Sequence, residues 1–147
     1  MAEIRRAEAT WSGDLLSGSG TVRAATSGAF GDLPVTWASR TADHAGRTSP
    51  EELVAAAHAA CFSMALSGGL ARAGHTVERL DVSADVTFDK TDAGWRVTSS
   101  ALSVRGRVPG MSAADFDAQA EAARDGCPIS NALKGNVALS VEASLEA

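Results

Sequence analysis

The chain has 147 residues, of which 45% are hydrophobic and 21% charged, a length and composition typical of one folded domain. Its 13 Lys and Arg residues are outnumbered by 18 Asp and Glu residues, which gives a formal net charge of −5. This balance argues against nucleic acid or an anionic membrane as a partner, because both require clustered basic residues. We expect residues 1–147 to form a single domain.

The N-terminal part is predicted to contain strands that are joined by glycine turns. Residues 7–11 and 21–24 are two short strand candidates, each next to a glycine-containing turn. A third candidate is Leu33–Thr41, where Val35 and Trp37 alternate with polar residues. We therefore expect three strands before the first helix.

The first predicted helix has a complete start signal. Ser49 suits the N-cap, Pro50 the first helical position, and Glu52 the third position, where it would complete a capping box. Residues 53–70 are apolar around nearly the whole circumference, a pattern typical of a buried central helix. Glycines from 68 to 74 mark its end region.

The rest of the chain alternates between strand and helix signals. In chain order, the predicted elements are a strand Leu80–Phe88, a hairpin loop 90–94, a strand Trp95–Val108, a helix Ala113–Arg124 capped by Ser112, a short helical turn Cys127–Leu133 and a strand Val137–Leu145. In the first long strand, alternate residues from Leu80 to Phe88 are expected to face inward. In the second long strand, the residues expected to face inward are Trp95, Val97, Leu102 and Val104. This order predicts an α+β domain with a mostly antiparallel sheet.

Targeting signals are not apparent in the sequence. No apolar core follows the N-terminal residues, so a signal peptide is not expected. The most apolar stretch, Leu53–Leu66, is shorter than the roughly 20 residues of a membrane span and contains His58 and Ser63. We therefore expect a cytoplasmic protein that does not enter a membrane.

The chain has only two cysteines, Cys61 and Cys127, and in the cytosol such a pair is more often reduced, catalytic or metal-binding than a permanent disulfide. A zinc site is weakly supported, because only His58 has a suitable spacing to a cysteine. Cys61 lies within an apolar helix, where burial raises a thiol pKa, so by itself it reads as a small core residue. Cys127 precedes Pro128 at a helix start, which stabilises a thiolate.

A nearby cation would turn Cys61 into a nucleophile. Arg40 and Arg47 precede the helix, and Glu51 could orient either of them through a two-pronged ion pair. Favourable charge at a helix N-terminus explains Glu51 equally well. His58 lies three residues before Cys61 on the same helical face and could act as a base, although a satisfied interior histidine is the favoured interpretation.

Two segments of the sequence resemble the signatures of the OsmC and organic hydroperoxide resistance superfamily. Residues 49–66, with His-Ala-Ala-Cys-Phe-Ser at 58–63, resemble its signature helix, and Gly126-Cys127-Pro128-Ile129-Ser130 resembles its second signature. Residues 11–20, 85–90 and 108–110 resemble other parts of the family, so the likeness covers nearly the whole chain. The first signature is closer to the OsmC branch.

The resemblance implies a fold and a set of site residues. The expected fold is a mostly antiparallel sheet wrapped around a buried central helix, in an intertwined homodimer with active sites at the dimer interface. Cys61 matches the peroxidatic cysteine, Cys127 the resolving cysteine, and Glu51 the catalytic glutamate that pairs with an arginine. We expect Arg40 to be the arginine that pairs with Glu51.

Arg47 and Arg23 are the alternatives to Arg40, because the family takes this arginine from different loops in different branches.

The resemblance also implies an activity. The expected protein is a thiol peroxidase of oxidative and osmotic stress, which reduces organic hydroperoxides, and hydrogen peroxide more weakly. Cys61 would become a sulfenic acid, Cys127 would form a disulfide with it, and an external dithiol, with a lipoyl-type donor among the candidates, would reduce that disulfide. No flavin, haem or metal is needed.

Two hypotheses from other classes stay open. The same fold could serve a non-enzymatic redox sensor or small-ligand-binding protein, or a structural domain with inert thiols.

Overall fold

The computed structural model describes residues 1–146. These residues form two compact units, Met1–Leu53 and a second unit that begins at Val54. The single-domain expectation stays a prediction.

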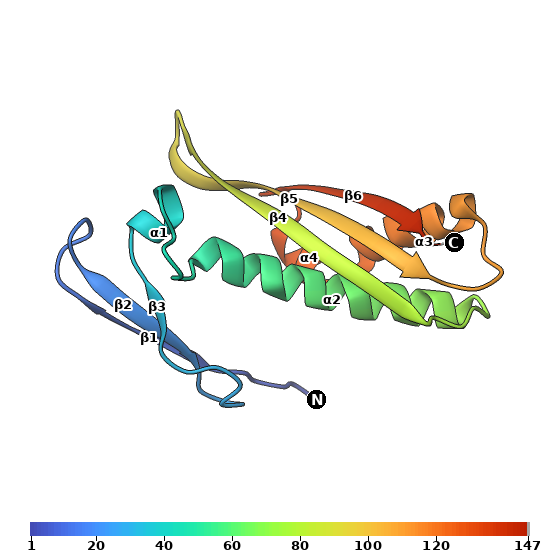
Figure 1. The fold of residues 1–147 in the computed structure, drawn as a ribbon, viewed down its shortest axis with the longest axis horizontal. Coiled ribbons are helices and arrows are strands. Elements are labelled where there is room, and N and C mark those ends of the chain that lie inside the picture. Colours follow the sequence, from blue (N-terminus) through green and yellow to red (C-terminus); the bar gives the residue numbers. More distant parts are fainter. Residues whose placement is uncertain (147) are drawn as a thin grey trace. The chain divides into compact units, whose positions relative to one another are not determined.

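The first unit contains a three-stranded antiparallel sheet. Strands β1 (Ala7–Ser12), β2 (Ser19–Ala24) and β3 (Leu33–Val35) lie in the order β1-β2-β3 (Figure 1, blue). The turn between β1 and β2 is closed by Asp14, whose carboxylate accepts the backbone N–H groups of two following residues at 3.0 and 2.8 Å. The first two predicted strands are therefore confirmed.

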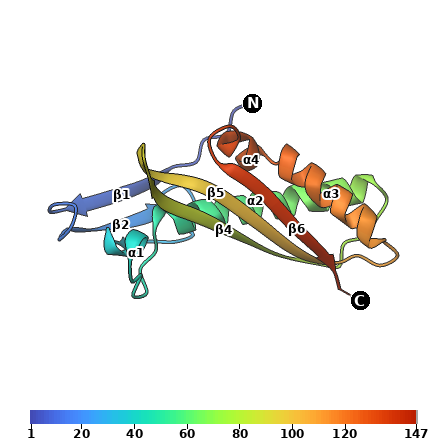
Figure 2. The same ribbon diagram turned by 90° about the horizontal axis from the view of Figure 1, so that it is seen from above.

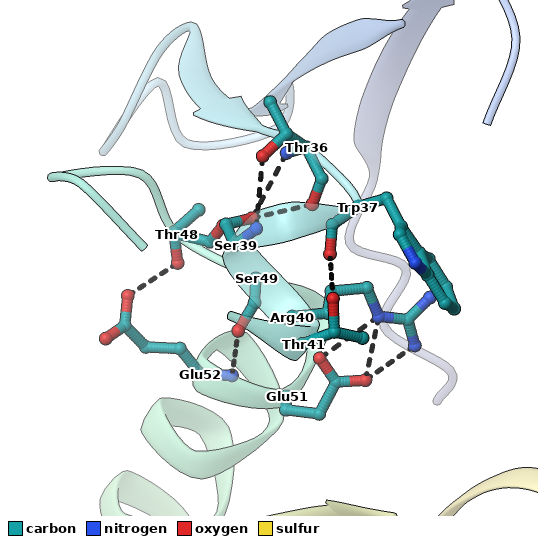
Figure 3. Close-up of polar contacts among 9 residues, drawn as sticks. All are labelled: Thr36, Trp37, Ser39, Arg40, Thr41, Thr48, Ser49, Glu51 and Glu52. Atoms are coloured by element: carbon teal, nitrogen blue, oxygen red, sulfur yellow. Dashed lines mark hydrogen bonds and ion pairs between the residues drawn. The ribbon is translucent and has the colours of Figure 1, made fainter. Parts of the chain in front are cut away.

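The third predicted strand is wrong beyond its first residues. After β3 the chain forms a short helix, α1 (Ala38–Thr41). Thr36 and Ser39 each accept the other's backbone N–H through a side-chain oxygen, both at 3.1 Å (Figure 3). These local bonds turn the chain out of the extended conformation that the alternation of Val35 and Trp37 had predicted.

Helix α2 (Pro50–Arg72) begins where the sequence predicts. The Ser49 hydroxyl accepts the Glu52 backbone N–H at 3.1 Å, which confirms the N-cap. The Glu52 carboxylate accepts the Thr48 hydroxyl at 2.7 Å (Figure 3). The helix runs through Gly68 and Gly69 and ends just before Gly74, whose φ of +86° is the left-handed conformation that glycine adopts readily.

The second unit is built on the sheet of β4 (Arg79–Thr91), β5 (Gly94–Arg107) and β6 (Ala138–Leu145), in the order β4-β5-β6. Strands β4 and β5 form a long antiparallel hairpin. Strand β6 pairs with β5 in parallel, because α3 and α4 form a crossover connection between them. The α+β class and the mostly antiparallel sheet are confirmed.

A β-bulge in β5 decides which side chains face the core. Phe88 pairs with Val97 while the preceding residue of β4 pairs with Ser99, which leaves Thr98 as the extra residue. The bulge reverses the alternation, so Ser100 and the alternate residues after it are buried. The predicted inward position of Trp95 is wrong: its side chain is 45% exposed and stacks on Phe88, with ring centroids 4.9 Å apart.

Helices α3 (Ala113–Gly126) and α4 (Pro128–Leu133) match the two predicted helices, and Ser112 caps α3 by accepting the Asp115 backbone N–H at 3.1 Å. Helices α2 and α3 cover one face of the sheet (Figure 2). The core between them comprises Phe62, Leu66, Leu70, Leu102, Val104, Val108, Phe116, Ala120, Ala123 and Cys127. Full burial of each large apolar side chain contributes roughly 1.5–3 kcal/mol.

Helix α2 is buried along one face. His58, Phe62 and Leu66 are fully buried, whereas Ala60 and Met64 are exposed. With 23 residues, α2 is long and apolar enough to cross a membrane, so the length argument from the sequence was wrong. Its packing against the sheet of the second unit is that of a core helix in a globular domain.

Candidate active site

The two cysteines come together in the second unit. Cys61 lies on α2 and is partly exposed, whereas Cys127 is fully buried and forms the N-cap of α4. Each thiol shifts the pKa of the other through a side-chain hydrogen bond, so the two sulfurs are neighbours. The structure thus brings together the two residues that the sequence singled out for thiol chemistry.

The first turn of α4 presents backbone N–H groups to both sulfurs. The Ser130 N–H donates to the Cys127 sulfur at 3.3 Å, and the Ile129 N–H donates to the Cys61 sulfur. These donors have no partner within the helix, because the first N–H groups of any helix lack a preceding carbonyl. The helix start that follows the Gly-Cys-Pro segment therefore provides hydrogen-bond donors to both thiols.

The environment separates the two thiols by acidity. Burial raises the pKa of Cys61, and contact with Cys127 raises it further, against the lowering effect of the Ile129 N–H. Burial also acts to raise the pKa of Cys127, but hydrogen bonds from Ser130 and Cys61 outweigh it and lower that pKa overall. The accessible thiol is therefore the less acidic one.

In the first unit, Arg40 and Glu51 form a two-pronged ion pair (Figure 3). The Arg40 Nη2 lies 2.6 Å from Glu51 Oε1, and its Nε lies 3.2 Å from both carboxylate oxygens. Glu51 is only 6% exposed, so this partner offsets the cost of burying its charge. The guanidinium also packs over the Trp37 ring, 5.5 Å from its centroid.

The other candidate arginines are placed differently. Arg23 pairs with Glu8 on the neighbouring strand, with Nη2 2.6 Å from a carboxylate oxygen. Arg47 lies in the loop between α1 and α2, where its backbone N–H donates to the His44 carbonyl at 2.8 Å. Of the three arginines, Arg40 is the one seen to contact Glu51.

A largely apolar pocket of about 350 Å³ lies beside Arg40 in the first unit. Its lining residues are Trp11, Leu15, Val35, Thr36, Trp37, Arg40 and Pro50. The sequence analysis did not single out Trp11 or Leu15 for this pocket. The signal was present, since an apolar residue in a polar turn, such as Leu15, has no core to enter.

His58 is completely buried and bonded at both ring nitrogens. Its Nδ1 lies 2.7 Å from the Ser100 hydroxyl oxygen, and its Nε2 lies 2.8 Å from the Ser130 hydroxyl oxygen. Burial lowers the pKa of His58, which favours the neutral ring. The favoured interpretation of an interior histidine with satisfied hydrogen bonds agrees with this geometry. Sequence reasoning missed Ser100, because the bulge in β5 decides that it points inward.

Metal ligation finds no support in the part of the chain that the structure describes. No cluster of three or more His, Cys, Asp or Glu side chains lies close enough there to hold an ion.

The family model described as OsmC-like protein matches residues 43–142, a segment that contains Glu51, Cys61 and Cys127. The chain belongs to the OsmC-like family. The sequence-based recognition of the superfamily is confirmed.

Curated relatives of this OsmC-like chain have names that refer to peroxides. It is 44% identical to peroxiredoxin OsmC of Escherichia coli (strain K12) over 135 residues, covering 92% of this chain and 93% of that protein. It is 36% identical over 97 residues to organic hydroperoxide resistance protein OhrA of Bacillus subtilis (strain 168), covering 65% and 66%. These names support a peroxide-related function.

The fold also matches solved structures. The crystal structure of the organic hydroperoxide resistance protein OhrB of Bacillus subtilis superposes with a TM-score of 0.74 at 25% identity, covering 95% of this chain and 98% of that one. An organic hydroperoxide resistance protein from Elizabethkingia anophelis, at 24% identity and a TM-score of 0.73, shares the fold over 99% of this chain and 100% of its own.

The buried His58 predicts how stability depends on pH. Its pKa is lowered below the ordinary 6.5 in the folded state, so the unfolded chain binds the extra proton first as pH falls. The free energy of unfolding should therefore decrease from about pH 6.5 downwards, before most carboxylates titrate. Urea denaturation between about pH 5 and 7 measures this slope. His58→Gln should remove most of it and His75→Gln should leave it; an equal slope in His58→Gln contradicts the prediction.

Proposed function

We propose that the protein is a cysteine-based peroxidase that reduces organic hydroperoxides to alcohols. The observation that carries the proposal is the placement of an accessible thiol, Cys61, beside a buried second thiol, Cys127. An exposed thiolate can reach a peroxide, and a neighbouring thiol can close a disulfide without a large movement of the chain. The names of the curated relatives support the same class of reaction.

In the first step the Cys61 thiolate attacks the O–O bond of the hydroperoxide. An S–O bond forms as the O–O bond breaks, and the released alkoxide takes up a proton to become the alcohol. Cys61 is left as a sulfenic acid. The O–O bond is weak and costs little to break, so this step needs no cofactor.

In the second step Cys127 attacks the Cys61 sulfenic acid. The S–S bond forms, the S–O bond breaks, and the hydroxide leaves as water with the proton that Cys127 gives up. An external dithiol then reduces the disulfide through a mixed-disulfide intermediate. A dihydrolipoyl donor is one candidate for that dithiol.

The Arg40–Glu51 pair would activate Cys61. Burial raises the Cys61 pKa, so the thiolate needs a cation to be populated at neutral pH. A guanidinium keeps its charge at every relevant pH. The Glu51 carboxylate holds the Arg40 guanidinium in place through a bidentate ion pair. The proposal requires this pair to lie against Cys61 in the working protein, within one subunit or across a dimer. The apolar pocket beside Arg40 would accept the organic group of the substrate.

A homodimer is the second part of the proposal. Helix α2 carries an exposed apolar stripe of residues spaced four apart, Ala56, Ala60 and Met64, and Met64 is 71% exposed. Small residues at this spacing allow the close approach of another element. A second copy of the chain would cover the stripe and make α2 the fully buried helix that its composition indicates.

The cysteines should differ in their roles during turnover. Cys61→Ser should lose t-butyl hydroperoxide consumption in the presence of dithiothreitol, because it lacks the nucleophile. Cys127→Ser should still reduce about one equivalent of hydroperoxide and should accumulate a Cys61 sulfenic acid, which dimedone and mass spectrometry detect.

Wild-type protein that forms no disulfide with hydroperoxide would refute the peroxidase. Disulfide formation without turnover, even with abundant dithiothreitol or dihydrolipoamide, would instead favour a redox sensor. Comparison of t-butyl hydroperoxide with hydrogen peroxide tests the predicted preference for organic substrates.

Arg40 should lower the pKa of Cys61. In a Cys127→Ser background, where Cys61 is the only thiol, Arg40→Met should raise the pKa of Cys61 by about 1–3 pH units, because it removes a cation. The ultraviolet absorbance of the thiolate measured against pH gives this value. Arg23→Met, whose arginine pairs with Glu8, is the matched control and should change nothing. Identical titrations for Arg40→Met and its parent would reject Arg40 as the activator.

The exposed stripe on α2 should hold the dimer together. Wild-type protein should sediment as two chains, and Met64→Glu should shift it towards one, since a buried carboxylate without a partner is costly. Ala93→Glu at the exposed tip of the β4–β5 hairpin is the control and should stay dimeric. A monomeric wild type would contradict the proposed homodimer.

A further inference from the structure

A continuous polar path leads from the Cys127 sulfur into the core of the second unit. The Ser130 hydroxyl hydrogen-bonds the sulfur and lies 2.8 Å from Nε2 of His58, and Nδ1 of His58 lies 2.7 Å from the Ser100 hydroxyl. All four residues are at most 1% exposed. The peroxidase steps above use only the first of them.

The hydrogen-bond donors and acceptors along the path allow a proton to move from one residue to the next. A hydroxyl donates one hydrogen bond, and a neutral imidazole donates through one nitrogen and accepts through the other. With Cys127 as a thiol, its S–H can donate to Ser130, the Ser130 O–H to Nε2 of His58, and Nδ1–H to Ser100. In that arrangement the chain of donors that begins at the thiol ends on an imidazole lone pair, which is a base.

Cys127 needs such an acceptor because of its burial. A thiol must lose its proton to attack a sulfenic acid, since the thiolate is the nucleophile. The Cys127 side chain is 0% exposed, so its proton cannot pass directly to bulk water. Burial also lowers the pKa of His58, which keeps the ring neutral and able to accept a proton at neutral pH.

We propose that Ser130 and His58 together take the proton of Cys127 when it attacks oxidised Cys61, an inference that rests on the proposed peroxidase function. His58 is a positioning residue in this scheme, because it reaches Cys127 only through the Ser130 hydroxyl. Ser100 holds the ring from the other side and sets which nitrogen faces Ser130.

The step balances in atoms and electrons. As the Cys127 sulfur bonds to Cys61, the thiol proton passes to the Ser130 oxygen, and the former Ser130 proton passes to Nε2 of His58. The Cys61 S–O bond breaks at the same time, so the sulfenic sulfur is reduced and the Cys127 sulfur is oxidised. The imidazolium then returns its proton to the Ser130 oxygen as the Ser130 hydroxyl gives its own proton to the departing hydroxide, which leaves as water.

Titratable and charged groups from several elements lie near the path. One turn from His58, α2 carries Cys61, the start of α4 carries Cys127, and β5 presents the uncharged Ser100. The charged side chains on α3 and beside α4 that share a pocket of about 230 Å³ with Ser130 are Arg124, Asp125 and Lys134.

Rapid mixing of the full-length protein with excess t-butyl hydroperoxide tests the proposal. Acid quenching at intervals and mass spectrometry follow two species separately, the Cys61 sulfenic acid and the Cys61–Cys127 disulfide. In His58→Gln, disulfide formation should slow by about 100-fold, the low end of the range for general base catalysis, while the sulfenic acid forms at the wild-type rate. His75→Gln, the same substitution at a partly buried loop histidine outside the path, should change neither rate.

The pH profile separates a relay from a purely structural histidine. The wild-type rate of disulfide formation should fall in acid as His58 becomes protonated and loses its lone pair. His58→Gln should lack that acid limb, because glutamine does not titrate. Equal disulfide rates and equal pH profiles in wild type and His58→Gln would overturn the proposal.

Ser130→Ala keeps the proposal testable where His58→Gln does not fold. It removes one oxygen, breaks the link to Cys127 and keeps the bond between His58 and Ser100. Slow disulfide formation by this variant, with a normal sulfenic acid rate, supports the path, and a wild-type disulfide rate overturns it.

A failure of the proposed function itself is visible separately, as the absence of Cys61 sulfenic acid in the wild type. In that case Cys127 is titrated in a Cys61→Ser background, without peroxide. Ser130→Ala should raise the Cys127 pKa there, and an unchanged titration would overturn the link between Ser130 and Cys127.

Discussion

The packing of α2 on the sheet of the second unit is the constraint on which the thiol site depends. Phe62 and Leu66 are fully buried between β5 and α3, so α2 cannot rotate about its axis without exposing them to water. Successive helical residues are about 100° apart, and Cys61 directly precedes Phe62, so the rotation that buries Phe62 places Cys61 at the edge of the buried face. Its partial exposure beside a buried partner follows from that rotation.

The same burial divides the chemical properties between the two thiols. Cys61 is accessible to solvent, but its pKa is raised. Cys127 accepts hydrogen bonds that lower its pKa, but it is not accessible to solvent. Among its described residues, the second unit therefore supplies a reachable thiol whose pKa no cation lowers. This division explains why a permanently charged arginine, held by a buried carboxylate, is a necessary part of the proposed function. The Arg40–Glu51 pair has the required rigidity, because its two-pronged geometry and the Trp37 ring restrict the guanidinium.

The polar path through His58 shows how the core tolerates polar groups. Each of its side chains has a hydrogen-bond partner, and a buried group that loses its partner costs about 1–3 kcal/mol. Such a fully connected network tolerates loss of one member poorly, so it holds β5, α2 and α4 in one arrangement. A group that fixes the structure in this way is also well placed to move a proton, since its geometry varies little.

The sequence by itself determined most of the helices and the identity of the thiols. Caps such as Ser49 and Ser112 are local signals, and each residue needs only its neighbours to act. The strands of the β4–β5 hairpin could also be predicted from the sequence, because alternation is a local pattern.

Tertiary structure decided the rest. The reciprocal bonds of Thr36 and Ser39 overrode alternation at α1, the bulge at Thr98 turned Ser100 inward, and β6 paired in parallel with a strand remote in the sequence. The enclosure of His58 by two serines likewise joins residues that no local pattern relates, so only the folded chain could select them.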